Sequence, residues 1–146
     1  DITEYKYLNM FPFENNMYSA MISGKDLINL ISKVTGYDGF YPLSGVRVYV
    51  EKNKQFPSKG KVNRVVLLDS LGKESEIDID KKYKITSTGF LIKDYGDSFK
   101  LVKDWWHPEL TKENDMDKDY IHKCLQNTES LNKNSNMDHL RTIFVN

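Results

Sequence analysis

Three short segments place aromatic rings beside glycines or a carboxylate, a combination that suits the binding of a flat heterocycle. They cover residues 11–16, 39–45 and 89–99. A ring next to glycine at the end of a helix or strand can keep one face open, and a nucleobase stacks on such a face for about 1–3 kcal/mol. A carboxylate on the same loop can accept hydrogen bonds from the neighbouring hydroxyls of a ribose. One interpretation of the pattern is therefore nucleoside binding.

The same rings fit a second interpretation, in which Phe40, Phe90 and Phe99 fill the hydrophobic core. Phenylalanine is mostly buried in folded proteins, so packing is the commoner role for any single ring. Spacing alone leaves both interpretations open.

Residues that could carry out hydrolysis are sparse in this chain. Its three histidines, His107, His122 and His139, share no metal-binding spacing of three or four residues. Cys124 is the only cysteine and lies among polar residues, which argues against a nucleophile and rules out an intrachain disulfide. No phosphate-binding glycine loop, nucleophile elbow or His-Glu-x-x-His motif occurs. The sequence therefore predicts no catalytic residue and no metal site within the chain.

Composition argues against two classes of partner. The 146 residues include 21 basic and 21 acidic side chains, so no excess of positive charge attracts nucleic acid or an anionic membrane surface. The apolar runs span only a few residues, whereas a membrane helix needs about 20. We therefore expect no nucleic-acid partner and no membrane-spanning segment.

The clearest predicted element is a helix over residues 23–36. Ser23 stands at the N-cap position, and Asp26, three residues later, completes a pair that resembles a capping box. Gly36 stands where a C-cap glycine would end the helix. Apolar side chains recur between these limits at helical spacing, at Leu27, Leu30, Ile31 and Val34.

The remaining pattern is mostly that of strands. Alternating or β-forming residues predict strands at 17–22, 46–51, 62–68 and 83–88. The polar residues 52–61 are expected to form a hairpin loop, and residues 69–72 a turn. Further along, the charged residues 112–119 are interpreted as a solvated loop that enters a helix at 117–126.

One clear helix beside several strands, without regular alternation, predicts a single mixed α+β domain. We place its substrate-binding body at residues 1–110. Residues 111–146 are then a polar C-terminal extension, whose 117–126 helix packs on the same domain.

The order of these segments resembles the C-terminal domain of 5′-nucleotidases, a family that includes bacterial UDP-sugar hydrolases and animal ecto-nucleotidases. The matching features begin with Phe-Pro-Phe-Glu-Asn at residues 11–15, followed by the first strand and the helix. They continue with the Gly-Phe turn at 39–45, the strands after it, and Gly-Phe-Leu followed by Tyr-Gly-Asp-Ser-Phe at 89–99. The resemblance covers residues 1–103.

This resemblance assigns site residues one by one. The two phenylalanines that sandwich the base in the family fall on Phe40 and Phe90, and the ribose-binding aspartate falls on Asp97. Tyr95 and Gly96, in the same segment, are expected to contact the substrate, and a purely structural role for Tyr95 is the alternative. A tyrosine and a serine replace two glycines of the family's Gly-Gly-Asp-Gly, which adds bulk beside the ligand and leaves the exact substrate open.

The resemblance implies an α+β substrate-binding domain of a phosphohydrolase that acts on nucleotides or related phosphate esters. In this family the catalytic residues and two divalent metal ions, zinc or similar, belong to an N-terminal metallophosphoesterase domain. We therefore expect this chain to be inactive alone and to hold no cofactor of its own. We also expect a processed piece that works with that catalytic domain, from the same precursor or as a companion chain, in an extracytoplasmic, secreted or vacuolar location.

Two alternatives stay open at this point. One is a non-enzymatic binding or interaction domain of a degenerate 5′-nucleotidase-like protein. The other is the substrate domain of a hydrolase for a different phosphoester, such as a nucleotide-sugar or a cyclic nucleotide.

Overall fold

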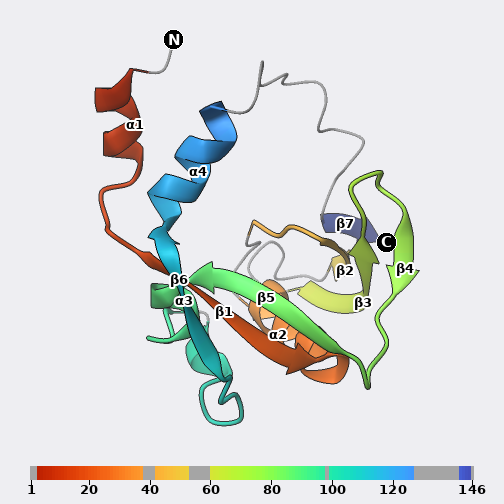
Figure 1. Cartoon of the computed structure of the whole chain (residues 1–146). Helices are drawn as coiled ribbons and strands as arrows, with labels where there is room; N and C mark the ends of the chain where they lie inside the picture. Colours follow the sequence, from red (N-terminus) through yellow and green to blue (C-terminus); the bar gives the residue numbers. More distant parts are fainter. Residues whose placement is uncertain (1–2, 38–41, 53–59, 98, 127–141, 146) are drawn as a thin grey trace.

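The computed structural model describes residues 3–37, 42–52, 60–97, 99–126 and 142–145 (Figure 1). Its elements follow one another along the chain as α1 (Glu4–Met10), β1 (Asn16–Ser23), α2 (Gly24–Tyr37), β2 (Val46–Lys52), β3 (Gly60–Leu68), β4 (Glu74–Glu76), β5 (Lys82–Thr88), α3 (Gly89–Ile92), the 3₁₀ turn η1 (Phe99–Leu101), β6 (Leu110–Met116), α4 (Asp117–Gln126) and β7 (Thr142–Val145).

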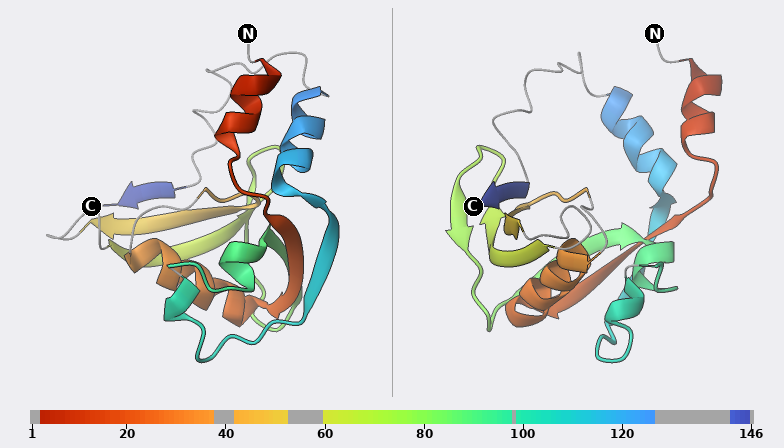
Figure 2. Two further views of the ribbon diagram at one scale, coloured as in Figure 1. Left: turned by 90° about the vertical axis from the view of Figure 1, so that its left-hand side faces the viewer. Right: turned by 180° about the vertical axis from the view of Figure 1, so that it is seen from behind.

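Two small sheets form the body of the molecule. The first has the strand order β5-β1-β6, with both pairings antiparallel. The second has the order β4-β3-β2-β7, in which β7 runs parallel to β2 and the other pairings are antiparallel. Helix α2 contacts β1 of one sheet and β3 of the other (Figures 1 and 2). This arrangement confirms the predicted α+β class.

The core lies where α2 meets the two sheets. The helix is confirmed, and Ser23 caps its start as predicted, because its hydroxyl accepts from the Asp26 amide at 3.1 Å. The Asp26 carboxylate bonds Ser23 in return, but it accepts from the Ser23 hydroxyl, at 2.8 Å, and not from the backbone amide as in a full capping box. The helix continues one residue past the predicted stop, to Tyr37. Apolar side chains of α2 join those of β1 and β2 in one buried cluster that includes Ala20, Ile22, Leu27, Leu30, Ile31, Val34, Val46, Val48 and Val50.

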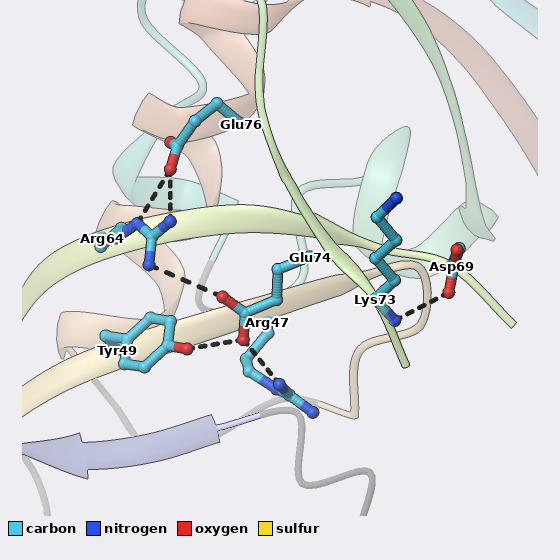
Figure 3. Close-up of polar contacts among 7 residues, drawn as sticks. All are labelled: Arg47, Tyr49, Arg64, Asp69, Lys73, Glu74 and Glu76. Atoms are coloured by element: carbon cyan, nitrogen blue, oxygen red, sulfur yellow. Dashed lines mark hydrogen bonds and ion pairs between the residues drawn. The ribbon is translucent and has the colours of Figure 1, made fainter. Parts of the chain in front are cut away.

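The four predicted strands are confirmed, to within two residues at each end, as β1, β2, β3 and β5. The predicted turn at 69–72 is also present. In it Gly72 adopts a φ of 81° and donates to the Asp69 carbonyl at 3.1 Å. The Asp69 carboxylate in addition accepts from the Lys73 amide at 2.8 Å, which leads the chain into β4 (Figure 3). The predicted loop at 52–61 lies mostly outside the described residues.

The interpretation of residues 112–119 as a solvated loop is wrong. Residues 110–116 form strand β6, which pairs with β1 in a register that sets Lys112 opposite Tyr18 and Leu110 opposite Ala20. Backbone hydrogen bonds hold this strand, and charged side chains are common on an edge strand because they discourage further pairing. Helix α4 then has the predicted bounds.

Helices α1 and α4 lie side by side and project from the sheets as an arm (Figures 1 and 2). Tyr7 joins them, because its hydroxyl donates to the Lys118 carbonyl and its ring centroid lies 5.5 Å from that of His122. Thr3 caps α1 by accepting from the Lys6 amide at 3.3 Å. Several large apolar side chains of the arm are exposed, namely Tyr5, Leu8, Met10, Tyr120 and Ile121.

The second sheet carries a connected network of charged side chains (Figure 3). One Glu74 oxygen accepts from Arg47 and from Tyr49, at 2.6 Å each, and the other lies 3.6 Å from Arg64. Arg64 in turn donates to Glu76 through two of its nitrogens. The network ties the three-residue strand β4 to β2 and β3, with two positive charges facing two negative ones.

This network predicts a pH-dependent contribution to stability. Hydrogen bonds from Tyr49 and Arg47 lower the pKa of Glu74. Because the folded-state pKa lies below the unfolded-state value, the ionised carboxylate stabilises the fold above the unfolded value, and this contribution is lost as the pH falls through the folded value. We expect Glu74→Gln to lower the Tm at pH 7, and the gap to the wild type to close as the pH falls below about 4.

Circular dichroism melts at pH 7 and at acid pH measure both effects. Glu109→Gln serves as the control, since Glu109 is exposed and outside the network. Equal Tm values for Glu74→Gln and the wild type at pH 7 would show that the network does not stabilise the fold.

Candidate functional site

Phe90 presents an open aromatic ring just past the end of β5. The residue is 55% exposed, whereas Phe99 is 8% exposed, so the core interpretation is right for Phe99 and wrong for Phe90. The Phe90 ring lies against Gly96, because a Cβ atom added there would stand 2.5 Å from the ring's Cε1. The Gly96 amide also donates to the Phe90 carbonyl at 2.8 Å. The ring is therefore supported by the chain at Gly96, and about half of the residue is open to solvent.

The loop between Phe90 and Gly96 is held by its own backbone. The Gly89 carbonyl accepts from the amides of residues 93 and 94, at 2.9 and 3.1 Å. Tyr95 then adopts a φ of 53°, in the left-handed region that few non-glycine residues occupy. This conformation turns the chain so that Gly96 returns to the ring.

Tyr95 lies in the structure as an anchor of this loop. Its half-buried ring packs against the core cluster, and its hydroxyl donates to the Trp106 carbonyl at 3.2 Å. Its expected contact with a substrate stays a prediction.

Asp97 follows Gly96 directly, and its side chain is 84% exposed. The Lys100 Nζ lies 2.7 Å from the Asp97 Oδ1, and this ammonium lowers the pKa of Asp97. The group is thus a carboxylate at neutral pH, which accepts hydrogen bonds and donates none. The structure brings the open Phe90 ring, Gly96 and the Asp97 carboxylate together in one loop.

The other predicted ring, Phe40, lies outside the described residues, as does Tyr41 beside it. Its pairing with Phe90 across a base therefore stays a prediction.

Sequence reasoning overlooked a second exposed ring near this loop. Phe13 is 72% exposed and precedes β1. The carbonyl oxygen of Asn16, at the start of β1, lies 3.4 Å from where a Cβ of Gly89 would stand. Three residues of chain span at most about 11 Å, so Phe13 belongs to the same end of the sheet as Phe90. The signal was present, since Phe13 stands in the Phe-Pro-Phe motif, but the motif alone assigned it no role.

The side chains at this site can hold a ligand by stacking and by polar contacts. Within the described part of the chain, no group of three or more His, Cys, Asp or Glu side chains is placed to bind a metal ion. No helix there combines the length and the hydrophobicity that a membrane crossing requires.

Comparison with known proteins places these observations in a family. The model of the 5′-nucleotidase C-terminal domain matches residues 1–104. No curated protein matches the sequence.

Among solved structures, the chain is similar to a 5′-nucleotidase precursor from Thermus thermophilus, with a TM-score of 0.66 and 21% identity over 97% of this chain and 27% of that one. It is also similar to the NAD nucleotidase of Haemophilus influenzae, with a TM-score of 0.66 and 16% identity over 99% of this chain and 27% of that one. A putative 5′-nucleotidase from Staphylococcus aureus gives a TM-score of 0.63 and 13% identity over 97% of this chain and 29% of that one. These identities show a shared fold, and the chain spans little more than a quarter of each protein's length.

The contact between Gly96 and Phe90 predicts the effect of a single methyl group. Gly96→Ala should displace the ring, because its Cβ would lie 2.5 Å from the ring's Cε1. The half-exposed ring is free to swing outward, so we expect a shift of the Phe90 aromatic NMR signals with a fall in Tm of less than about 3 °C. In a Phe90→Ala background, Gly96→Ala should change the Tm less than it does in the wild type, because the added Cβ no longer meets an aromatic ring. Unchanged Phe90 signals in Gly96→Ala would rule out the contact.

Proposed function

Because this chain belongs to the family of 5′-nucleotidase C-terminal domains, we propose that it holds the substrate of a nucleotide phosphohydrolase. The observation that supports the proposal is the open ring of Phe90, backed by Gly96 and followed at once by the ionised carboxylate of Asp97. A ring face suits the base of a nucleotide, and a carboxylate suits its sugar hydroxyls.

In this proposal the base stacks on Phe90 and the ribose hydroxyls donate to Asp97. Stacking of a base on an aromatic ring contributes about 1–3 kcal/mol. A second ring on the other side of the base would double the contact area. Phe40 is the ring that the family resemblance assigns to this place, and Phe13 is the exposed ring that the described structure offers at the same end of the sheet.

Hydrolysis itself is assigned to a separate catalytic domain of the metallophosphoesterase type. Two divalent metal ions, zinc or similar, would supply an activated water there and neutralise the charge that develops on the leaving oxygen. The role of this chain is to bind and orient the nucleotide, so we propose that the chain alone has no phosphohydrolase activity.

The arm formed by α1 and α4 is the surface that we assign to contact with that catalytic domain. Its exposed apolar side chains, Tyr5, Leu8 and Met10 on α1 with Tyr120 and Ile121 on α4, gather on two helices that lie side by side. A large patch of exposed apolar side chains often marks a surface that binds another protein or domain. The solved relatives, of which this chain matches little more than a quarter, have ample further chain to cover the arm.

Substitution of Phe90 tests the proposal. In the full-length protein, Phe90→Ala should raise the KM for AMP about tenfold, the equivalent of ~1.4 kcal/mol of stacking, with kcat little changed. The wild-type Tm should be kept, since the ring is exposed. Steady-state phosphate release measures both constants for AMP and UMP. Chromatographic detection of the nucleotide products shows whether UDP-glucose or a cyclic nucleotide is hydrolysed.

Matched variants identify the second ring and control for unfolding. A raised KM in Phe40→Ala but not Phe13→Ala supports the family's assignment, and the reverse supports Phe13. Phe99→Ala removes a buried ring and should lower the Tm instead. If Phe90→Ala keeps the wild-type KM for every substrate, Phe90 does not belong to the site. If the full-length protein binds nucleotides without hydrolysing them, it is a nucleotide-binding protein and not a phosphohydrolase.

A further inference from the structure

Asp97 and Lys100 form an exposed ion pair beside the open ring. The Lys100 Nζ lies 2.7 Å from the Asp97 Oδ1, and the side chains of Lys100 and Asp97 are 63% and 84% exposed, respectively. Asp97 directly follows Gly96, the residue on which the Phe90 ring rests. Both charged groups therefore lie within four residues of the glycine that supports the ring.

Backbone and core contacts hold the residues on both sides of this pair, whereas the two side chains are exposed. Phe99, between them, is buried, and its ring centroid lies 5.4 Å from that of Trp106. The amides of Phe99 and Lys100 both donate to the Gly96 carbonyl, at 2.7 and 3.3 Å. An exposed ion pair is weak, so a ligand can rearrange the two side chains at little cost.

The two groups complement a pair of neighbouring hydroxyls. A carboxylate only accepts hydrogen bonds and an ammonium only donates them, whereas each hydroxyl does both. The Asp97–Lys100 bond uses one carboxylate oxygen and one ammonium proton. Neither side chain has another polar partner among the residues that the structure describes, so the second oxygen and two protons are available.

The network around Glu74 shows the opposite case. There one carboxylate oxygen already accepts from Arg47 and Tyr49, and the other faces Arg64 (Figure 3). That network has a structural role, because it joins β4 to β2 and β3. The Asp97–Lys100 pair joins no strands or helices that are distant in the sequence, since the two residues are three positions apart.

We propose that Lys100 donates to one ribose hydroxyl while Asp97 accepts from the other, which makes Lys100 a specificity-determining residue for ribose over 2′-deoxyribose. The inference rests on the proposed function, because it takes Asp97 as the carboxylate that binds the sugar. The pair has no net charge. A phosphate on the sugar would be attracted by Lys100 and repelled by Asp97, so the two effects would largely cancel. The recognised group is therefore the free diol.

Nucleoside binding to the full-length protein tests this role. The probes are adenosine and uridine, each compared with its 2′-deoxy counterpart by isothermal titration calorimetry. The wild type should bind the ribonucleosides about tenfold more tightly, as expected for hydrogen bonds to a charged group. Lys100→Met should lose most of this preference by weakening the ribonucleosides alone. Lys103→Met, at another exposed lysine close by, should behave as the wild type.

A double-mutant cycle separates this role from mere shielding of Asp97. If both groups bind the same diol, the changes in binding free energy caused by Asp97→Asn and Lys100→Met should be non-additive for adenosine. Both changes should be close to zero for 2′-deoxyadenosine. An unchanged ribose preference in Lys100→Met, with binding still dependent on Phe90, overturns the inference and leaves the proposed function standing. Failure of the wild type to bind any of the four nucleosides overturns both.

Discussion

The candidate site depends on the missing side chain of Gly96. Because that residue has no Cβ, the chain passes directly behind the Phe90 ring and supports it, while the Gly96 amide binds the Phe90 carbonyl. A ring held in this way keeps a hydrophobic surface in water without collapsing into the core. The exposure of Phe90 is thus a property of the loop's backbone, and in the proposed function the base stacks on the part of the ring that this loop leaves exposed.

The rest of the fold serves to hold this loop in place. Pairing of β1 with β5 brings the chain before β1 beside the start of α3, which places Phe13 and Phe90 at one end of the sheet. Below the loop, Phe99 and Trp106 anchor its far side in the core that α2 closes. The charge network of the second sheet lies on other strands, β2, β3 and β4, and joins β4 to its neighbours.

Much of this architecture was predictable because local chemistry agrees with it. Ser23 and Asp26 predict the start of α2, and the valines of β2 alternate as expected for a half-buried strand. Strand β6 was not predictable from its residues, since its charged side chains match a loop and only pairing with β1 makes it a strand. The exposure of Phe90 was equally hidden, because nothing in the composition distinguishes it from the buried Phe99. Family resemblance selected Phe90 and Asp97, but it gave no hint of Lys100, whose contact with Asp97 arises from the turn between them.

The most direct test of the proposed site is a crystal structure of the full-length protein with a non-hydrolysable adenosine 5′-phosphonate. We predict that the adenine ring lies parallel to the Phe90 ring, on the side away from Gly96 and about 3.5–4 Å from it, with the ribose hydroxyls bound to Asp97 and Lys100. A base bound elsewhere, with the Phe90 ring covered by protein, would contradict this prediction.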